Sequence, residues 1–200
     1  MRINLVVFVV LLFGILVLAM PISGIAAVKN LVGNPDFVKD MEGWSLGADY
    51  GTFDIDKSEK GIAGGNAALA NVTKVGANAW EPEIHSPAFD LAIGKKFTMS
   101  LWAKADKVSR PLILKFEQLD LWGGPTQEIS VTKDWAEYHF TPLMDIGSPP
   151  QFVIHVEFSG QTGKVWFSHF LVYEGDFVPE TLSPVTPANR LTTTWGEIKK

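Results

Sequence analysis

From Asn30 onward, apolar and polar residues alternate along most of this 200-residue chain instead of recurring with helical spacing. In residues 97–104, for example, every second residue from Phe97 to Ala103 is apolar. Alternation of period two is typical of strands with one buried face. Gly, Pro, Asn and Asp interrupt the chain at short intervals, as they do between short strands. The pattern predicts an all-β fold of two packed antiparallel sheets, with no helix.

Nine segments carry this pattern and are predicted to be strands. They span residues 50–55, 67–72, 79–85, 96–105, 112–119, 127–131, 136–142, 151–158 and 164–173. The last of them is apolar on both faces, so we expect it at the centre of a sheet, with residues 31–37 covering its back.

Both ends of the chain differ in composition from the middle. Residues 1–27 combine Arg2, an apolar run and small residues after Pro21, which is typical of a secretory signal peptide. A retained membrane anchor is the alternative, because the run approaches the roughly 17–25 residues that span a bilayer. Residues 179–200 have the Pro- and Thr-rich composition of a linker and tail, for which a sorting or docking partner is one hypothesis. The folded domain is predicted over 28–178 and is expected to be secreted or at the cell surface, in the periplasm or outside the cell.

The composition restricts the partners of this domain. The chain has no cysteine, which excludes disulfides and thiolate metal sites. Residues 1–27 hold one of the 17 basic residues and none of the 22 acidic ones, so the remainder has a net charge of −6. Because binding to phosphates is driven by Lys and Arg, nucleic acids and anionic membrane surfaces are unsuitable partners. Neutral ligands remain open.

Six short motifs follow one another in the middle of the chain. They are Asn34-Pro-Asp-Phe37 with Gly43-Trp44, Gly61 with residues 67–69, Trp80-Glu-Pro-Glu83, and residues 94–105, 131–140 and 165–172. In this order they resemble a carbohydrate-binding module of the family 4/9 type, a galactose-binding-domain-like jelly roll. The resemblance covers roughly residues 30–174.

The resemblance implies a non-catalytic jelly-roll sandwich that holds a glycan in a cleft on its concave sheet, often with a structural calcium ion. Val38 and Ser168 stand where the family often has acidic residues associated with calcium. Asp36 and Asp40 are then the remaining calcium candidates, which weighs against this cation, and we expect no other cofactor. Glu83 stands where a sugar-binding Gln is common, and an ionised Glu accepts hydrogen bonds but cannot donate them.

A glycan site needs flat aromatic surface together with convergent polar groups. Trp102, which faces outward on its strand, and Trp122, on a Gly-Gly-Pro turn, are the stacking candidates. Trp80 matches the family motif, although its phase with Ile84 favours packing. Three other tryptophans, Trp44, Trp135 and Trp166, are assigned to the core. The polar candidates for carbohydrate binding are Glu83, His85, Lys115, Glu117, His155 and Glu157.

Each candidate also has a plainer interpretation, as a buried aromatic ring or a solvated outward side chain. Two further classes of function stay open. The first is an adhesion or structural module without a glycan cleft. The second is an enzyme, either a glycoside hydrolase with paired Glu residues or a metal enzyme that uses His85 and His155 with a Glu. No catalytic motif supports an enzyme, so we predict a non-catalytic protein that binds a polysaccharide or oligosaccharide.

Overall fold

The computed structural model describes residues 28–47, 49–78, 80–146 and 151–179, and in these residues it has eleven strands and no helix. No described segment therefore forms an apolar helix that could cross a bilayer. The predicted signal peptide, the tail from residue 180 and the expected first residue of the strand at 79–85 lie outside the described residues.

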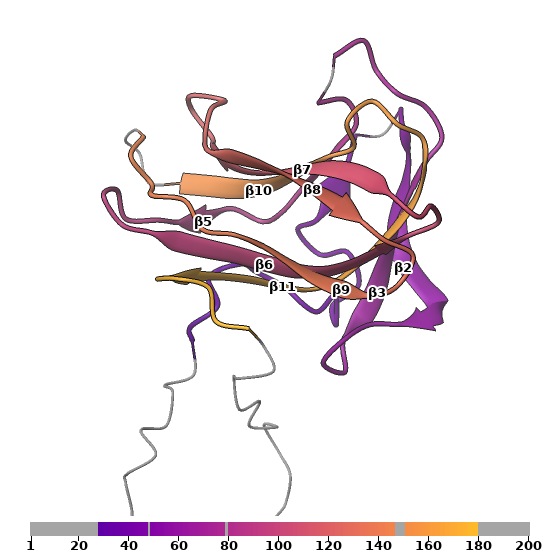
Figure 1. Ribbon diagram of the computed structural model, residues 1–200, viewed down its shortest axis with the longest axis horizontal. Coiled ribbons are helices and arrows are strands. Elements are labelled where there is room, and N and C mark those ends of the chain that lie inside the picture. The colour runs from indigo at the N-terminus through magenta and orange to yellow at the C-terminus, as the bar shows by residue number, and fades with distance from the viewer. Residues whose placement is uncertain (1–27, 48, 79, 147–150, 180–200) are drawn as a thin grey trace, which may run out of the picture.

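The strands form two antiparallel sheets that stack as a sandwich (Figure 1). The six-stranded sheet runs in the order β1 (Ser45–Leu46), β4 (Glu83–His85), β10 (Gln151–Glu157), β7 (Arg110–Gln118) and β8 (Thr126–Val131), with β5 (Phe89–Asp90) paired to β10. The five-stranded sheet runs in the order β2 (Gly51–Lys60), β3 (Asn66–Val72), β11 (Gly163–Glu174), β6 (Phe97–Ala105) and β9 (Ala136–Phe140). The predicted two-sheet sandwich is confirmed.

All nine predicted strands are present, and the two that were missed, β1 and β5, have two residues each. The largest differences are at strand ends. β4 begins only at Glu83, because Pro82 before it has no amide hydrogen to donate to a neighbouring strand. β2 continues to Lys60, beyond a register shift that starts at Ile55.

The core fills the space between the two sheets with the inward-facing side chains of each strand. These residues are all buried and include Met99, Leu101, Leu112, Leu114, Phe116, Phe152, Ile154, Val165 and Phe167. Burying one such large apolar side chain contributes about 1.5–3 kcal/mol, so this layer is the main source of stability. Trp44 joins the core as predicted and donates its indole N–H to the backbone oxygens of Gly33 and Asn34.

β11 lies at the centre of its sheet, between β3 and β6, as predicted. Its ladder with β6 is interrupted by a bulge between Ser168 and Leu171. The segment expected to cover the back of β11 hydrogen-bonds to the strand beside this bulge. The Leu31 amide donates to the oxygen of Val172 at 2.8 Å, and the Phe170 amide donates to the oxygen of Pro35 at 3.0 Å. The N-terminal segment thus supplies partners for backbone groups of the bulged strand.

The assignment of Trp135 and Trp166 to the core is wrong. Both are half-buried on the outer face of the five-stranded sheet. Their indole N–H groups donate to side chains of β2: Trp166 to Asp56 at 2.7 Å and Trp135 to Glu59 at 3.3 Å. These bonds explain the position, since an indole carries a polar group that needs a partner. We call this cluster the tryptophan face, and its residues are Asp56, Glu59, Trp102, Lys104, Trp135 and Trp166.

Candidate functional site

Three neighbouring strands of the six-stranded sheet bring the predicted polar residues together. Glu83 and His85 lie two residues apart on β4 and therefore point to the same side of the sheet. The register pairs His155 of β10 with His85 on one side and with Lys115 of β7 on the other. Glu157 lies opposite Glu83. Strand pairing alone thus assembles a group of ionisable side chains.

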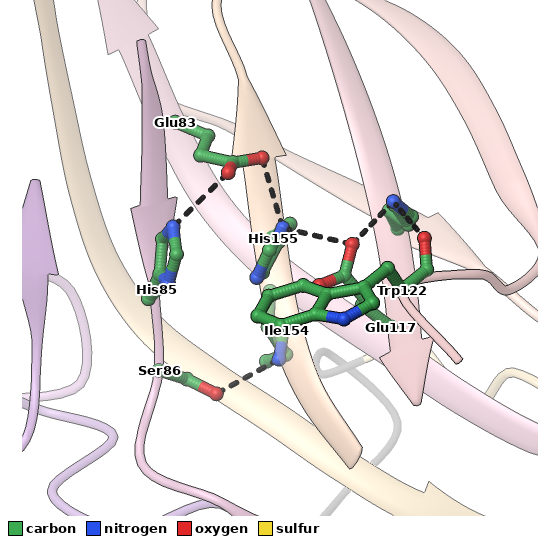
Figure 2. A network of polar contacts seen from close by, with 8 residues as sticks. Glu83, His85, Ser86, Glu117, Trp122, Ile154 and His155 are labelled. Carbon is green, nitrogen blue, oxygen red and sulfur yellow. Dashed lines mark hydrogen bonds and ion pairs between the residues drawn. The ribbon is translucent and has the colours of Figure 1, made fainter. Parts of the chain in front are cut away.

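The carboxylate of Glu83 bridges two imidazole rings, with one oxygen facing a nitrogen of each ring (Figure 2). Its Oε2 is 2.9 Å from Nδ1 of His155, and its Oε1 is 3.2 Å from Nε2 of His85. The two rings stack with their centroids 4.1 Å apart and their planes 30° apart. Nδ1 of His155 is also 3.4 Å from Oε2 of Glu117, whose carboxylate pairs with Lys115. One polar network therefore links β4, β10 and β7.

Two carboxyl groups of this surface have pKa values shifted in opposite directions. Burial by itself would raise the pKa of Glu83, but hydrogen bonds with His155 and His85 outweigh burial and lower the pKa to about 2. For Glu157, burial dominates and raises the pKa, although the positive charge of Lys115 opposes the shift. Glu83 is therefore ionised at neutral pH, whereas Glu157 releases its proton less readily than an ordinary Glu.

Trp122 lies on the loop between β7 and β8, and it is 73% exposed. Its φ of 54° is in the left-handed region, which bulky residues rarely adopt. Its amide donates to the oxygen of Gln118 at 3.0 Å, and the Gln118 amide donates to the oxygen of Gly123 at 2.9 Å. A Cβ on Gly124 would lie 1.7 Å from the oxygen of Phe116, so only glycine fits there. The loop is thus fixed against β7 and holds the indole in solvent.

A cleft with a volume of about 500 Å³ opens on this surface. We call the side chains that line it the cleft residues, and they are Trp80, Glu83, Lys115, Glu117, Trp122 and Glu157. All six belong to the predicted site. Two other predicted residues, His85 and His155, contact Glu83 but are not among the lining residues.

Trp80 is exposed, and the expectation that it packs with Ile84 is wrong. Trp80 is 50% exposed, whereas Ile84 is fully buried. β4 begins at Glu83, so the alternation of that strand does not extend back to Trp80. The ring is therefore available to the cleft.

Trp102 does not belong to the cleft, contrary to the prediction that it is a stacking surface of the same site. It lies on β6 in the five-stranded sheet, on the same side of that strand as Lys104. The apolar core separates the outer faces of the two sheets. Alternation shows that a residue faces outward, but it does not show which sheet contains the strand.

The two calcium candidates lie on the loop before β1. Oδ1 of Asp36 is 2.5 Å from Nδ1 of His169, and the backbone oxygen of Asp40 accepts a hydrogen bond from Asn34. Calcium binding there stays a prediction. Within the described ranges, one group of at least three His, Cys, Asp or Glu side chains has donor atoms close enough for a metal ion, and it consists of Glu83, His85 and His155.

Sequence reasoning missed Ser86, which ties β4 to β10 next to the network (Figure 2). Its Oγ accepts a hydrogen bond from the Ile154 amide at 2.9 Å, and its own amide donates to the oxygen of Ile154 at 3.1 Å. The hydroxyl donates to the oxygen of Pro87 at 2.8 Å. A serine after a strand carries no pattern that indicates this role.

Solved structures of carbohydrate-binding modules have the same fold as this chain. One is a CBM4 with 22% sequence identity and a TM-score of 0.60, and the match covers 72% of this chain and 99% of that chain. TmCBM61 in complex with β-1,4-galactotriose has 15% identity and a TM-score of 0.54, covering 74% of this chain and 99% of that one. The CBM22-1 xylan-binding domain of Xyn10C from Paenibacillus barcinonensis has 17% identity and a TM-score of 0.51, covering 76% and 98%. Comparisons with protein-family models and with curated protein sequences gave no match. These likenesses show the fold of the chain, an antiparallel two-sheet sandwich.

Proposed function

We propose that this chain is a secreted or cell-surface, non-catalytic carbohydrate-binding domain that holds a polysaccharide or oligosaccharide in the cleft of its six-stranded sheet. The observation that carries the proposal is the pair of exposed tryptophans, Trp80 and Trp122, on one cleft with buried charged groups. The fold shared with CBM4, with a galactotriose complex of TmCBM61 and with a xylan-binding domain supports the same assignment.

The cleft residues have the chemistry that a sugar ring requires. The apolar CH face of a pyranose stacks on an indole, and its hydroxyl groups need acceptors and donors in fixed positions. Glu83, Glu117 and Glu157 supply acceptors, and Lys115 supplies a donor. A neutral glycan satisfies these groups without the repulsion that an acidic one would meet.

Glu117 has unused capacity for such a ligand. Glu117 is 4% exposed. Its Oε2 atom contacts Lys115 and His155, whereas its Oε1 atom has no hydrogen-bond partner among the described residues. A buried acceptor without a partner costs about 1–3 kcal/mol. Because Oε1 is covered, the carboxylate would have to rotate toward the cleft that it lines before a hydroxyl group of a bound glycan could supply the missing bond and recover part of that cost.

The proposal predicts a large effect of the cleft tryptophans on glycan retention. Removing a central Trp from a binding surface costs about 2 kcal/mol or more, which is about 30-fold in Kd. Affinity electrophoresis with soluble polysaccharides, chosen by a glycan array, should therefore show a loss of about this size for Trp122→Ala and for Trp80→Ala. Trp102→Ala is the matched control on the other sheet and should bind normally.

Two results would contradict the proposal. Normal retention by both cleft variants, with unchanged melting temperatures, would instead favour an adhesion or structural module without a glycan cleft. Release of reducing sugars by the wild-type chain, abolished by Glu157→Gln or Glu83→Gln while binding persists, would identify a hydrolase. The Glu157→Gln variant is included because this carboxyl group has the raised pKa that a general acid needs.

A further inference from the structure

We propose that Glu83, His85 and His155 form a binding site for one divalent first-row transition-metal ion of the Zn²⁺ class. This site adjoins the glycan cleft through Glu83. It does not depend on the proposed carbohydrate function, because its ligands and its test are separate.

The donor atoms already have nearly the spacing of a metal site. One ring nitrogen of His155, one of His85 and a carboxylate oxygen of Glu83 all lie within 4.8 Å of one another. The two imidazole nitrogens are 2.9 and 3.2 Å from the carboxylate oxygens that they face. In a tetrahedral zinc site with bonds of about 2.0–2.1 Å, neighbouring donors are about 3.3–3.4 Å apart. An ion can therefore enter the cluster after small side-chain shifts.

The backbone holds these three side chains in place before any ion binds. Glu83 and His85 point to one side of β4, and the register places His155 directly beside His85. The bonds between Ser86 and Ile154 fix the two strands at the next position (Figure 2). Ligands on rigid paired strands lose little conformational entropy on binding, which favours affinity.

The donor set selects the class of metal. Two imidazole nitrogens and one carboxylate suit Zn²⁺, Cu²⁺ or Ni²⁺, whereas Ca²⁺ and Mg²⁺ prefer sites made of oxygen alone. His155 is buried and His85 is 40% exposed at its side chain, so the ion would reach the cluster from the His85 side. A water molecule or a ligand oxygen would complete the tetrahedron on the open side, as in zinc sites with three protein ligands.

The local charge also favours a divalent cation. Three carboxyl groups, those of Glu83, Glu117 and Glu157, surround His155. Lys115 pairs with Glu117. In the metal-free state, imidazole N–H groups occupy the space between the rings and the carboxylate. The ion would replace these protons and bring two positive charges into a group dominated by carboxylates.

The test measures Zn²⁺ binding by isothermal titration calorimetry, on the full chain previously dialysed against a chelator. We expect one ion per chain. His85→Asn and Glu83→Gln should each weaken binding by at least about tenfold, since even the loss of an outer-shell partner costs about 10–100-fold. His139→Asn is the matched control, because His139 is one of the four histidines but lies on β9 in the five-stranded sheet, where it stacks on Phe177. Co²⁺ in place of Zn²⁺ should give the visible absorption of a tetrahedral site in the wild type but not in His85→Asn.

Three outcomes would overturn the proposal. They are the absence of saturable Zn²⁺ binding, unchanged binding by both ligand variants, and an equal loss in the His139→Asn control. His85 is partly exposed, so His85→Asn is expected to fold even if substitutions of buried His155 do not. Trp122→Ala should keep full Zn²⁺ affinity, which separates a failure of the metal site from a failure of glycan binding.

Discussion

The outer faces of the two sheets both combine tryptophan, lysine and carboxylates, yet they arrange these groups differently. On the tryptophan face, the indole N–H groups of Trp135 and Trp166 donate to acidic side chains of β2. Lys104 pairs with Glu59 and lies 5.6 and 5.0 Å from the centroids of the two rings. Among the cleft residues, by contrast, Trp80 and Trp122 are 50% and 73% exposed.

The difference shows that tryptophan on an outer face is not by itself a sign of ligand binding. On the tryptophan face the polar atoms satisfy one another. Hydrogen bonds from Ser58 and then from Trp166 lower the pKa of Asp56 to about 2. In the cleft, exposed rings stand beside Glu117, which has a buried oxygen without a partner in the described part of the chain. The first arrangement serves the stability of the sheet, and the second is suited to a ligand.

Replacing the paired lysine of each face should change the free energy of unfolding more than the other substitutions do, and by very different amounts on the two faces. Lys115→Met leaves Glu117, whose side chain is 5% exposed, without its cation, which should reduce the free energy of unfolding by about 3 kcal/mol. Lys104→Met affects a more solvated pair, with Glu59 29% exposed, and should cost about 1 kcal/mol or less. Urea denaturation of the two variants beside the wild type measures both values. Equal losses would mean that the two ion pairs do not differ in burial as the structure indicates.

A smaller effect is expected when one indole N–H is removed from the tryptophan face. Trp166→Phe keeps an aromatic ring on the outer face of β11 but cannot donate a hydrogen bond to Asp56. The variant should therefore lose some stability, less than Lys115→Met loses, and keep its glycan retention. Urea denaturation and affinity electrophoresis on the same preparation provide the two measurements. A loss of retention would assign ligand contact to the tryptophan face and remove the distinction between the two surfaces.

The fold was largely predictable from the sequence because burial of one strand face leaves a local pattern. All nine alternating segments are strands, and the two missed strands are too short to show a period. The sheet to which each strand belongs is not a local property. β4 pairs with β10 about 70 residues later, and no pattern within either strand specifies that partner.

The candidate site was likewise predictable where it depends on local alternation, and not where it depends on the pairing of distant strands. Charged residues at alternate positions predicted a polar patch on three strands, and the register of β4, β10 and β7 brings those residues together. Trp102 does face outward, as its alternation predicts, but its strand belongs to the five-stranded sheet and not to the sheet of the cleft. The alternation alone therefore led to its wrong placement in the site. For Trp135 and Trp166, hydrophobicity suggested the core, whereas acidic partners on β2 keep both rings on the outside. Such partners depend on tertiary contacts.

The smallest expected effect concerns the pH dependence of one carboxyl group on each face. Burial raises the pKa of Glu157 above its ordinary value, so its ionised form destabilises the folded state at neutral pH. The hydrogen bond from Lys104 lowers the pKa of Glu59, so its ionised form stabilises the folded state. Replacing each residue by Gln should therefore shift stability in opposite directions at pH 7.

Glu157→Gln should melt at a higher temperature than the wild type at pH 7, and Glu59→Gln at a lower one. For Glu157, the difference should shrink as the pH falls through its raised folded-state pKa, and it should vanish below the ordinary value, where both chains are uncharged at this position. For Glu59, the deficit should persist to more acidic pH, because the folded state keeps that carboxylate ionised below the ordinary pKa. Thermal unfolding of the three proteins between pH 7 and pH 3 measures the trend. A lower melting temperature of Glu157→Gln than of the wild type at pH 7 would show that the folded state compensates ionised Glu157 as it does Glu59, and this difference between the two faces would then be lost.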